Sequence, residues 1–417
     1  MFFKDILRTL VSKFFILIIN FALVVLTTNL WGAEGRGIIS ILVANMAIIA
    51  ILNNVLGGYC ITYFTPKIGF EKLVLPAYIW IIIVSIVSSA ITIYIQGHDN
   101  AAILIFLTIL NSLFTVQLFL FTAKGNFKLF NIFSLLQPLL LLVFALFFEY
   151  ILKVKSFKSY LYGYIVALSI SWFFSLIKSR QYLKGKRLEV SFKSSIQVMK
   201  YGWQTELSSF LQFLSYRLSY FFILFYKGFS SVGVFSVGIA LTEAIWMISR
   251  SISTVQFSQI INNIEVSDGI KITKQSAKLS FISSLFILII MMLLPTSVFK
   301  LVFGHSFEQV KEIMIFLFPG IIAIAISNIY GHFFSATGKT VVLIIKSVVG
   351  LFVTVIVSVL LIPRFGIVGA CLAASASYLA SSIYLFVAFY KNTKFHYKDL
   401  IISKNEIKDK IVQLFIK

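Results

Sequence analysis

The sequence predicts an all-α polytopic membrane protein of about twelve transmembrane helices. Hydrophobic residues make up 59% of the 417 residues and charged residues only 12%, and the mean hydropathy is +0.97. Soluble domains are about half apolar and about a quarter charged. The apolar residues also cluster in runs of about 20, the length of helix that crosses a hydrocarbon core. Composition and run length together exclude a soluble fold.

Twelve apolar runs follow one another, with short polar segments between them. Their ranges are 14–31, 37–57, 73–95, 101–122, 129–148, 159–177, 201–226, 232–256, 279–299, 312–335, 340–362 and 366–390. No small-residue cleavage site closes the first run, so we expect an uncleaved span rather than a signal peptide. No predicted outer loop is long enough to fold as a domain.

The basic residues give a formal net charge of +21, and their placement indicates the orientation of the chain. With both termini placed in the cytoplasm, 25 of the 36 Lys and Arg residues fall in inner segments and 8 in outer segments. This bias follows the positive-inside rule, so we expect a multi-pass protein with both termini cytoplasmic. Because the rule accounts for the charge, we expect no nucleic-acid partner. The outer loop KVKSFK is the exception to the bias.

The longest inner segment, a basic linker at 179–200, divides the runs into two sets of six. We predict an N-terminal six-helix half at 1–178, a C-terminal half at 201–390 and a basic cytoplasmic tail at 391–417. A shift of 196 residues aligns four residues at the same place in each half: Gly32 with Gly228, Gly37 with Gly233, Ser40 with Ser236 and Ala44 with Ala240. Six spans per half give a parallel repeat, which usually surrounds a central substrate cavity.

Ionisable residues inside the predicted spans are confined to the second half, apart from Glu149 at the end of a span. They are Glu206, Arg217, Glu243, Arg250, His332 and Lys346. A charge at the centre of a membrane helix costs roughly 2.5–3.5 kcal/mol on insertion scales, so it usually faces other helices or a wet cavity. These side chains are therefore the first candidates for a functional site.

Four of these charges are spaced for two ion pairs between the seventh and eighth spans. Glu206 and Arg217 are eleven residues apart, which places them within ~20° of one helix face. Glu243 and Arg250 are seven apart, with the same result. Counted from the turn between the spans, each arginine is level with the glutamate of the other span. Two interpretations stay open: the arginines neutralise the glutamates, or they face a cavity and bind an anionic substrate with their spare donors.

Other polar residues near these charges are further candidates. Lys346 lies near the inner end of its span, where it either extends to the interface or faces the cavity. Tyr216 and Tyr220 flank Arg217 and are candidates for bordering a sugar path, as is Asn20 in the first span.

His332 and the two cysteines are weaker candidates for a functional site. His332 lies near an inner end and is interpreted as a packed polar group or as a proton relay. Cys60 and Cys371 lie in or beside apolar runs, and no Cys/His cluster accompanies them. We therefore expect no metal site and no cofactor, and the cysteines say nothing about a disulfide.

Three segments carry a resemblance to a known family. In 213–260 the matching residues are Tyr216, Arg217, Gly228, Val232, Gly233, Ser236, Glu243 and Trp246. In 334–378 they are Gly338, Lys339, Ile362, Pro363, Gly366, Gly369 and Ala370, and the stretch LWGAEGRGIISIL also fits. The chain thereby resembles the Wzx-type polysaccharide flippases for O-antigen or capsule repeat units. These belong to the multidrug/oligosaccharidyl-lipid/polysaccharide exporter superfamily.

The resemblance implies that the chain moves undecaprenyl-pyrophosphate-linked oligosaccharide from the inner to the outer leaflet of the bacterial inner membrane by alternating access. Arg217, Arg250 and Lys346 are then the candidates for binding the pyrophosphate or an acidic sugar. Glu243 and Glu206 are the candidates for ion pairing or for coupling. The implied partners are this lipid-linked oligosaccharide, the phospholipid bilayer and other membrane proteins of polysaccharide assembly.

Two departures from the family pattern concern coupling. The family has an aspartate where this chain has Ser219, and a tyrosine where it has Phe235. A coupling carboxylate at position 219 is therefore absent. Any coupling would use Glu243, Glu206 or the membrane potential.

Two other function classes are weighed against flipping. A drug or cation exporter of the same superfamily would favour acids in the first-half cavity, and the first-half spans contain none. A membrane-embedded polysaccharide polymerase or glycosyltransferase typically needs a sizeable outer loop and a cluster suited to acid–base chemistry. The sequence has neither, so we expect that the chain is not an enzyme. A membrane scaffold without transport activity is a further alternative.

Overall fold

The structure is a computed structural model that describes residues 2–96, 101–183, 185, 187–189, 192–263 and 266–393. These described residues form helices and no strand. The first are α1 (Phe2–Asn53), α2 (Gly58–Ile68), η1 (Phe70–Lys72), α3 (Val74–Gln96), α4 (Ala101–Ala123), α5 (Phe127–Leu146), η2 (Phe147–Ile151), α6 (Lys158–Ser179) and η3 (Arg180–Tyr182). The others are α7 (Phe192–Asn263), α8 (Val266–Leu293), α9 (Thr296–Phe303), η4 (His305–Phe307), α10 (Val310–Ala336) and α11 (Thr340–Thr393). The predicted tail lies outside the described residues from 394 onward, as do 184, 186, 190 and 191 of the predicted linker.

Three of the long helices are broken by a glycine in the left-handed region of the backbone. The φ angles are 62° at Gly32 in α1, 78° at Gly228 in α7 and 56° at Gly366 in α11. Glycine adopts such angles at no steric cost, so each one ends a membrane-length arm and begins the next. Within the described ranges nine helices are long and apolar enough to span a membrane, and the three breaks raise the spans to twelve. The predicted fold class is confirmed, and two of the breaks fall on residues that the shift of 196 aligns.

Two short helices, α2 and α9, are not spans. Helix α2 lies between two predicted spans, and α9 begins within the last residues of the predicted run 279–299 and continues beyond it. They have 11 and 8 residues, too few to cross a membrane. Each buries apolar side chains along one side: Cys60 and Phe64 in α2, and Phe299 and Phe303 in α9. A search for runs of membrane length does not detect such helices, so the sequence prediction missed both.

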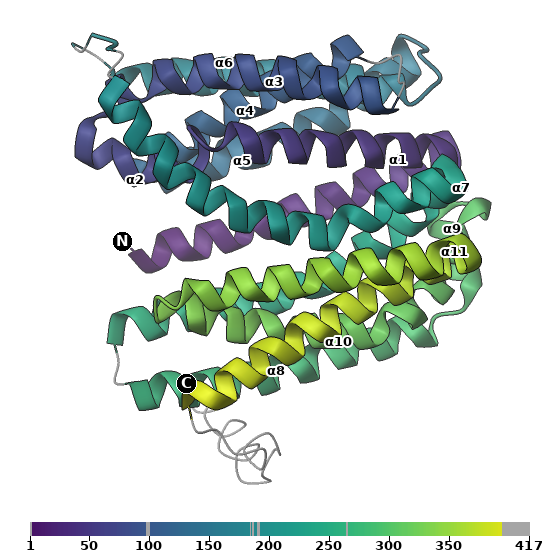
Figure 1. The fold of residues 1–417 in the computed structure, drawn as a ribbon. Coiled ribbons are helices and arrows are strands. Elements are labelled where there is room, and N and C mark those ends of the chain that lie inside the picture. The colour runs from purple at the N-terminus through teal and green to yellow at the C-terminus, as the bar shows by residue number, and fades with distance from the viewer. Residues whose placement is uncertain are drawn as a thin grey trace. The chain divides into compact units, whose positions relative to one another are not determined.

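The chain forms two compact units, which are described separately. Unit 1 comprises Met1–Phe213, Ile223–Val237 and Phe299–Glu308. In this unit α4 packs against α1, α2, α3, α5 and α6 (Figure 1). The contacts bury a core that includes Leu107, Phe121 and Leu168. Apolar packing therefore centres unit 1 on α4.

Asn53, at the end of α1, joins three helices of unit 1 through its amide. Its Nδ2 atom donates to the Ser85 hydroxyl in α3 at 2.9 Å and to the Ser112 hydroxyl in α4 at 2.7 Å. All three side chains are buried. Hydrogen bonds between membrane helices contribute on average about 0.6 kcal/mol and up to about 2 kcal/mol each.

We expect Asn53→Ala to lower the thermal stability of the purified protein, because it removes both bonds and leaves two buried hydroxyls without their donor. The loss should be about 1–3 kcal/mol, measured as a shift in the melting temperature in detergent. Thr122→Val is the matched control, because among the described residues the Thr122 hydroxyl bonds only to the Leu118 carbonyl of its own helix. Equal melting temperatures for the Asn53 variant and the wild type would contradict the prediction.

The corresponding arms of α1 and α7, which follow the first two glycine breaks, cross within unit 1 at a pair of glycines. A Cβ atom at Gly37 would overlap the carbonyl oxygen of Phe229, and a Cβ atom at Gly233 would overlap the carbonyl oxygen of Ala33. The shift of 196 converts each of these contacts into the other. The two backbones therefore meet symmetrically, and only glycine fits at either position.

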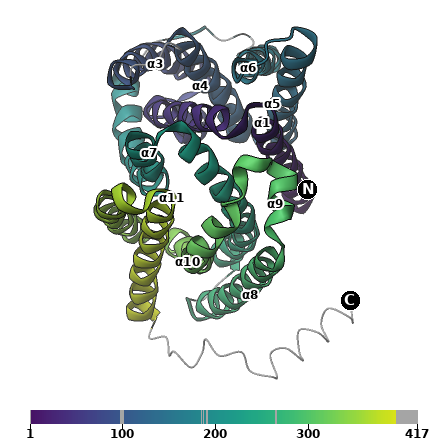
Figure 2. The same ribbon diagram turned by 90° about the vertical axis from the view of Figure 1, so that its right-hand side faces the viewer.

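Unit 2 comprises Leu214–Phe222, Gly238–Val298 and Gln309–Lys417. In this unit α10 packs against α8 and α11 (Figure 2). Hydroxyl groups bring α7 close to the same helices: Ser249 in α7 and Ser280 in α8 both donate to the Ala325 carbonyl of α10, at 2.5 and 2.9 Å. Small hydroxyl residues let membrane helices approach closely and bond across the contact. These bonds fix the second arm of α7, which carries Glu243.

Candidate functional site

The Arg217–Glu243 pair is the centre of the candidate site in unit 2. The Arg217 Nη2 atom lies 2.5 Å from the Glu243 Oε1 atom, as the spacing of the two spans predicts. The Arg217 Nη1 atom also donates to the Tyr220 hydroxyl at 2.7 Å, and the guanidinium lies 5.1 Å from the centre of that ring. The side chains of Arg217 and Glu243 are 27% and 43% exposed. The pair is therefore reachable from outside unit 2.

The pair leaves hydrogen-bonding capacity for a ligand. A guanidinium has five N–H donors, and a carboxylate accepts about four hydrogen bonds. Among the described residues Arg217 donates to Glu243 and Tyr220 only. The two interpretations of Arg217 are therefore compatible, because an arginine that neutralises Glu243 keeps donors for a phosphate or carboxylate.

An aromatic triad lies beside this pair and consists of Tyr216, Trp246 and Tyr378. The ring centres are 5.7 Å apart for Tyr216 and Trp246, 5.5 Å for Tyr216 and Tyr378, and 5.4 Å for Trp246 and Tyr378. Tyr216 and Trp246 come from the two arms of α7, and Tyr378 comes from α11. Tyr378 was missed by the sequence analysis, since a single tyrosine in the stretch AASASYLASS has no pattern that places it beside α7.

Arg250, His332 and Lys346 form a second group of basic side chains in unit 2. Lys346 is buried in α11, so it does not extend to the surface of this unit. The Lys346 ammonium and the Arg250 guanidinium both lie within electrostatic range of the His332 imidazole, which packs edge-on against the Phe257 ring at 5.9 Å. Three helices thus bring positive or titratable groups together, an arrangement suited to an anion.

The two remaining candidates belong to unit 1. Glu206 is buried in the first arm of α7, and Asn20 is an exposed residue of α1. The predicted pairing of Glu206 with Arg250 joins residues of different units, and it stays a prediction.

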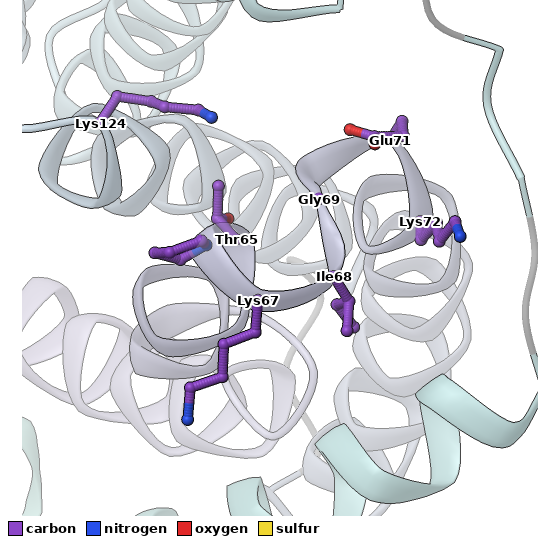
Figure 3. A pocket seen from close by; sticks show the side chains of 8 residues that line it. Thr65, Lys67, Ile68, Gly69, Glu71, Lys72 and Lys124 are labelled. Atoms are coloured by element: carbon purple, nitrogen blue, oxygen red, sulfur yellow. The ribbon is translucent and has the colours of Figure 1, made fainter.

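A pocket of about 520 Å³ in unit 1 is not part of the candidate site (Figure 3). Three lysines line it, and each has a partner. The Lys67 ammonium lies 3.4 Å from the Tyr63 ring centre, Lys72 pairs with Glu189 at 3.7 Å, and the Lys124 ammonium lies 5.9 Å from the Tyr182 ring centre. In Figure 3 the Lys67 side chain points away from Lys124 and Lys72. The pocket is an open depression whose charges serve local contacts.

No three His, Cys, Asp or Glu side chains converge anywhere in the described part of the chain. Cys60 and Cys371 are buried free cysteines of unit 1 and unit 2, respectively. The candidate site itself offers charge, hydrogen-bonding groups and aromatic faces.

Several solved structures of membrane transporters have a fold similar to that of this chain. No family model and no curated protein matches the chain. Among solved structures, the lipid II flippase MurJ in an inward closed conformation matches with a TM-score of 0.73 and 14% identity, covering 94% of this chain and 88% of that one. An inward-facing multidrug resistance MATE family transporter of the MOP superfamily matches with a TM-score of 0.69 and 15% identity, over 90% and 96%.

A third match extends the comparison beyond these two. A MOP superfamily transporter from Pyrococcus furiosus has a TM-score of 0.65 and 14% identity, over 93% of this chain and 95% of that one. Identities this low show the fold alone. The chain therefore has the fold of MOP superfamily transporters. The resemblance to Wzx-type flippases rests on the sequence motifs alone, and what it implies about function is taken up below.

Proposed function

We propose that the chain is a Wzx-type flippase, which moves undecaprenyl-pyrophosphate-linked oligosaccharide from the inner to the outer leaflet of the bacterial inner membrane. The observation that carries the proposal is the Arg217 guanidinium, an accessible cation on a membrane-length helix that keeps spare donors. A pyrophosphate or acidic sugar that crosses a membrane needs such counter-charge, and arginine binds it through two parallel hydrogen bonds.

The other charged and polar candidates take supporting roles in this proposal. Arg250 and Lys346 supply further counter-charge along the path, and His332 lies close to both. Glu243 releases Arg217 when an anion replaces its carboxylate, and Glu206 is a candidate for coupling. Tyr216, Tyr220 and Asn20 border the path of the sugars.

The fold supports transport rather than catalysis. The matching solved structures are named as transporters and as a flippase. The flippase is named for a lipid substrate, lipid II. Alternating access between the repeat-related halves is the expected mode of movement for such folds. Both termini lie in the cytoplasm in this proposal, and other membrane proteins of polysaccharide assembly are the natural partners.

Export of a drug or another cation by the same fold is the competing function, because MATE family transporters share it. The charges of unit 2 favour an anion instead. Apart from the Arg217–Glu243 pair, unit 2 holds the basic group of Arg250, His332 and Lys346. A cation would meet net repulsion at this group.

Deletion of the gene tests the proposal in the organism that carries it. The expected result is loss of surface polysaccharide together with accumulation of its lipid-linked repeat unit on the inner leaflet, both restored by the wild-type gene. The deletion is made in a strain without a second flippase. Normal surface polysaccharide with no accumulated repeat unit would rule the proposal out.

A further inference from the structure

Two buried hydrogen-bond donors of the aromatic triad have no partner among the described residues. Trp246 is 2% exposed and Tyr378 is 1% exposed. Within the part of the chain that the structure describes, neither the Trp246 Nε1 atom nor the Tyr378 hydroxyl makes a hydrogen bond. Most buried polar groups in folded proteins are paired, and each unpaired one costs about 1–3 kcal/mol. Two such groups on rings in mutual contact indicate that a partner binds here.

The unpaired groups lie on the side of the charged pair. The Tyr378 hydroxyl is within electrostatic range of Arg217 and Glu243. Trp246 is on the same helix as Glu243, three residues further along, so it lies on the same face one turn on. The buried triad and the partly exposed Arg217–Glu243 pair therefore form one cluster, in which the charged pair is the part that a ligand reaches first.

The residues around this point combine three kinds of interaction. Trp246 offers an N–H donor only, Tyr378 offers a hydroxyl that donates or accepts, and Arg217 adds charged donors. Glu243 accepts hydrogen bonds from hydroxyl groups. The aromatic rings supply apolar faces. A sugar ring presents the matching set, with hydroxyl oxygens that accept, hydroxyl hydrogens that donate, and apolar C–H faces.

We propose that Tyr216, Arg217, Glu243, Trp246 and Tyr378 form a subsite for one acidic sugar of the transported oligosaccharide. The sugar carboxylate replaces Glu243 on the Arg217 guanidinium, and ring hydroxyls take up the Trp246 and Tyr378 donors. Because these donors are buried, entry requires the Arg217–Glu243 pair to open. The choice of a sugar as the ligand rests on the proposed function.

The change Tyr378→Phe tests the subsite because it removes one oxygen atom and keeps the ring. The full-length protein in lipid nanodiscs is titrated with glucuronate and with glucose, and binding is followed by tryptophan fluorescence. We expect saturable binding of glucuronate and weaker binding of glucose. Tyr378→Phe should weaken glucuronate binding about five- to tenfold, the effect of one hydrogen bond, without lowering the melting temperature.

Two control variants separate binding from folding. Tyr330→Phe makes the same change at another buried tyrosine of unit 2, which packs on Phe389 at 4.8 Å, away from the triad, and should leave binding unchanged. Trp246→Phe should remove most of the fluorescence response. If the unpaired hydroxyl is only a structural defect or bonds to a water, Tyr378→Phe keeps full glucuronate affinity and its melting temperature is equal or higher. That result, or no response to either sugar, would overturn the proposal.

The test is independent of the flippase assignment. Sugar binding that depends on Tyr378, in a protein whose deletion leaves surface polysaccharide intact, would keep the subsite and discard the flippase. Loss of surface polysaccharide on deletion, with no sugar response in the purified protein, would keep the flippase and discard the subsite.

Discussion

Replacing Arg217 by lysine should reduce transport about 10- to 100-fold while the protein level and melting temperature stay near those of the wild type. Lysine keeps the positive charge that neutralises Glu243, but it lacks the planar fork that holds a carboxylate or phosphate by two bonds. Hydrogen bonds to charged groups contribute about 1.5–3 kcal/mol, which corresponds to this range. Transport is measured as complementation of the deletion strain, with membrane protein quantified in parallel.

A charge exchange separates the two roles of Arg217. Arg217→Glu alone places two carboxylates together, so both protein level and transport should fall. Adding Glu243→Arg should restore the protein level, because the ion pair is re-formed, but not transport. Arg364→Lys at an exposed position is the control for a lysine replacement elsewhere in unit 2. Full transport in the exchanged double variant would mean that Arg217 serves only to pair with Glu243.

Substitution of alanine at Gly37 or Gly233 should destabilise the protein strongly and abolish transport. A methyl group at either position overlaps a backbone carbonyl oxygen of the facing helix, and a backbone cannot rotate away as a side chain can. Overpacking costs typically about 1–3 kcal/mol even where side chains can adjust. Because the two contacts are related by the repeat, the two variants should behave alike in thermal unfolding and in transport.

Gly331→Ala is the matched control for the glycine pair. Gly331 is a helical glycine of α10, and a Cβ atom there would lie 3.7 Å from Leu343 and 4.0 Å from Leu385, an ordinary contact distance. This variant should keep wild-type stability and transport. A Gly37→Ala protein as stable and as active as the Gly331→Ala protein would show that the close crossing is not required.

The sequence predicts the fold well because membrane spans have a strong local signal. Run length gives twelve spans and their order, and the aligned pair Gly32 and Gly228 marks breaks that both have positive φ. The short helices α2 and α9 carry no such signal. The break at Gly366 was also not predicted as a break, although the two runs that it joins were placed correctly on either side of it.

The candidate site is only partly predictable for a related reason. The spacing of Arg217 and Glu243 on neighbouring antiparallel spans was enough to predict their contact, since helix geometry fixes both face and depth. Tyr378 comes from a helix far away in sequence, and nothing local indicates which side chain it meets. The unpaired donors of Trp246 and Tyr378 are a property of packing alone, so only the structure shows them.

The most direct test of the proposed function is flipping by the purified protein. Liposomes are loaded with the lipid-linked repeat unit isolated from the deletion strain, and a membrane-impermeant oxidant of sugars reports the fraction exposed in the outer leaflet. Wild-type protein should expose nearly all of the repeat unit to the oxidant, and the Arg217→Lys protein should leave the inner-leaflet fraction protected. If folded wild-type protein leaves the inner-leaflet fraction protected, the protein is not a flippase for this repeat unit.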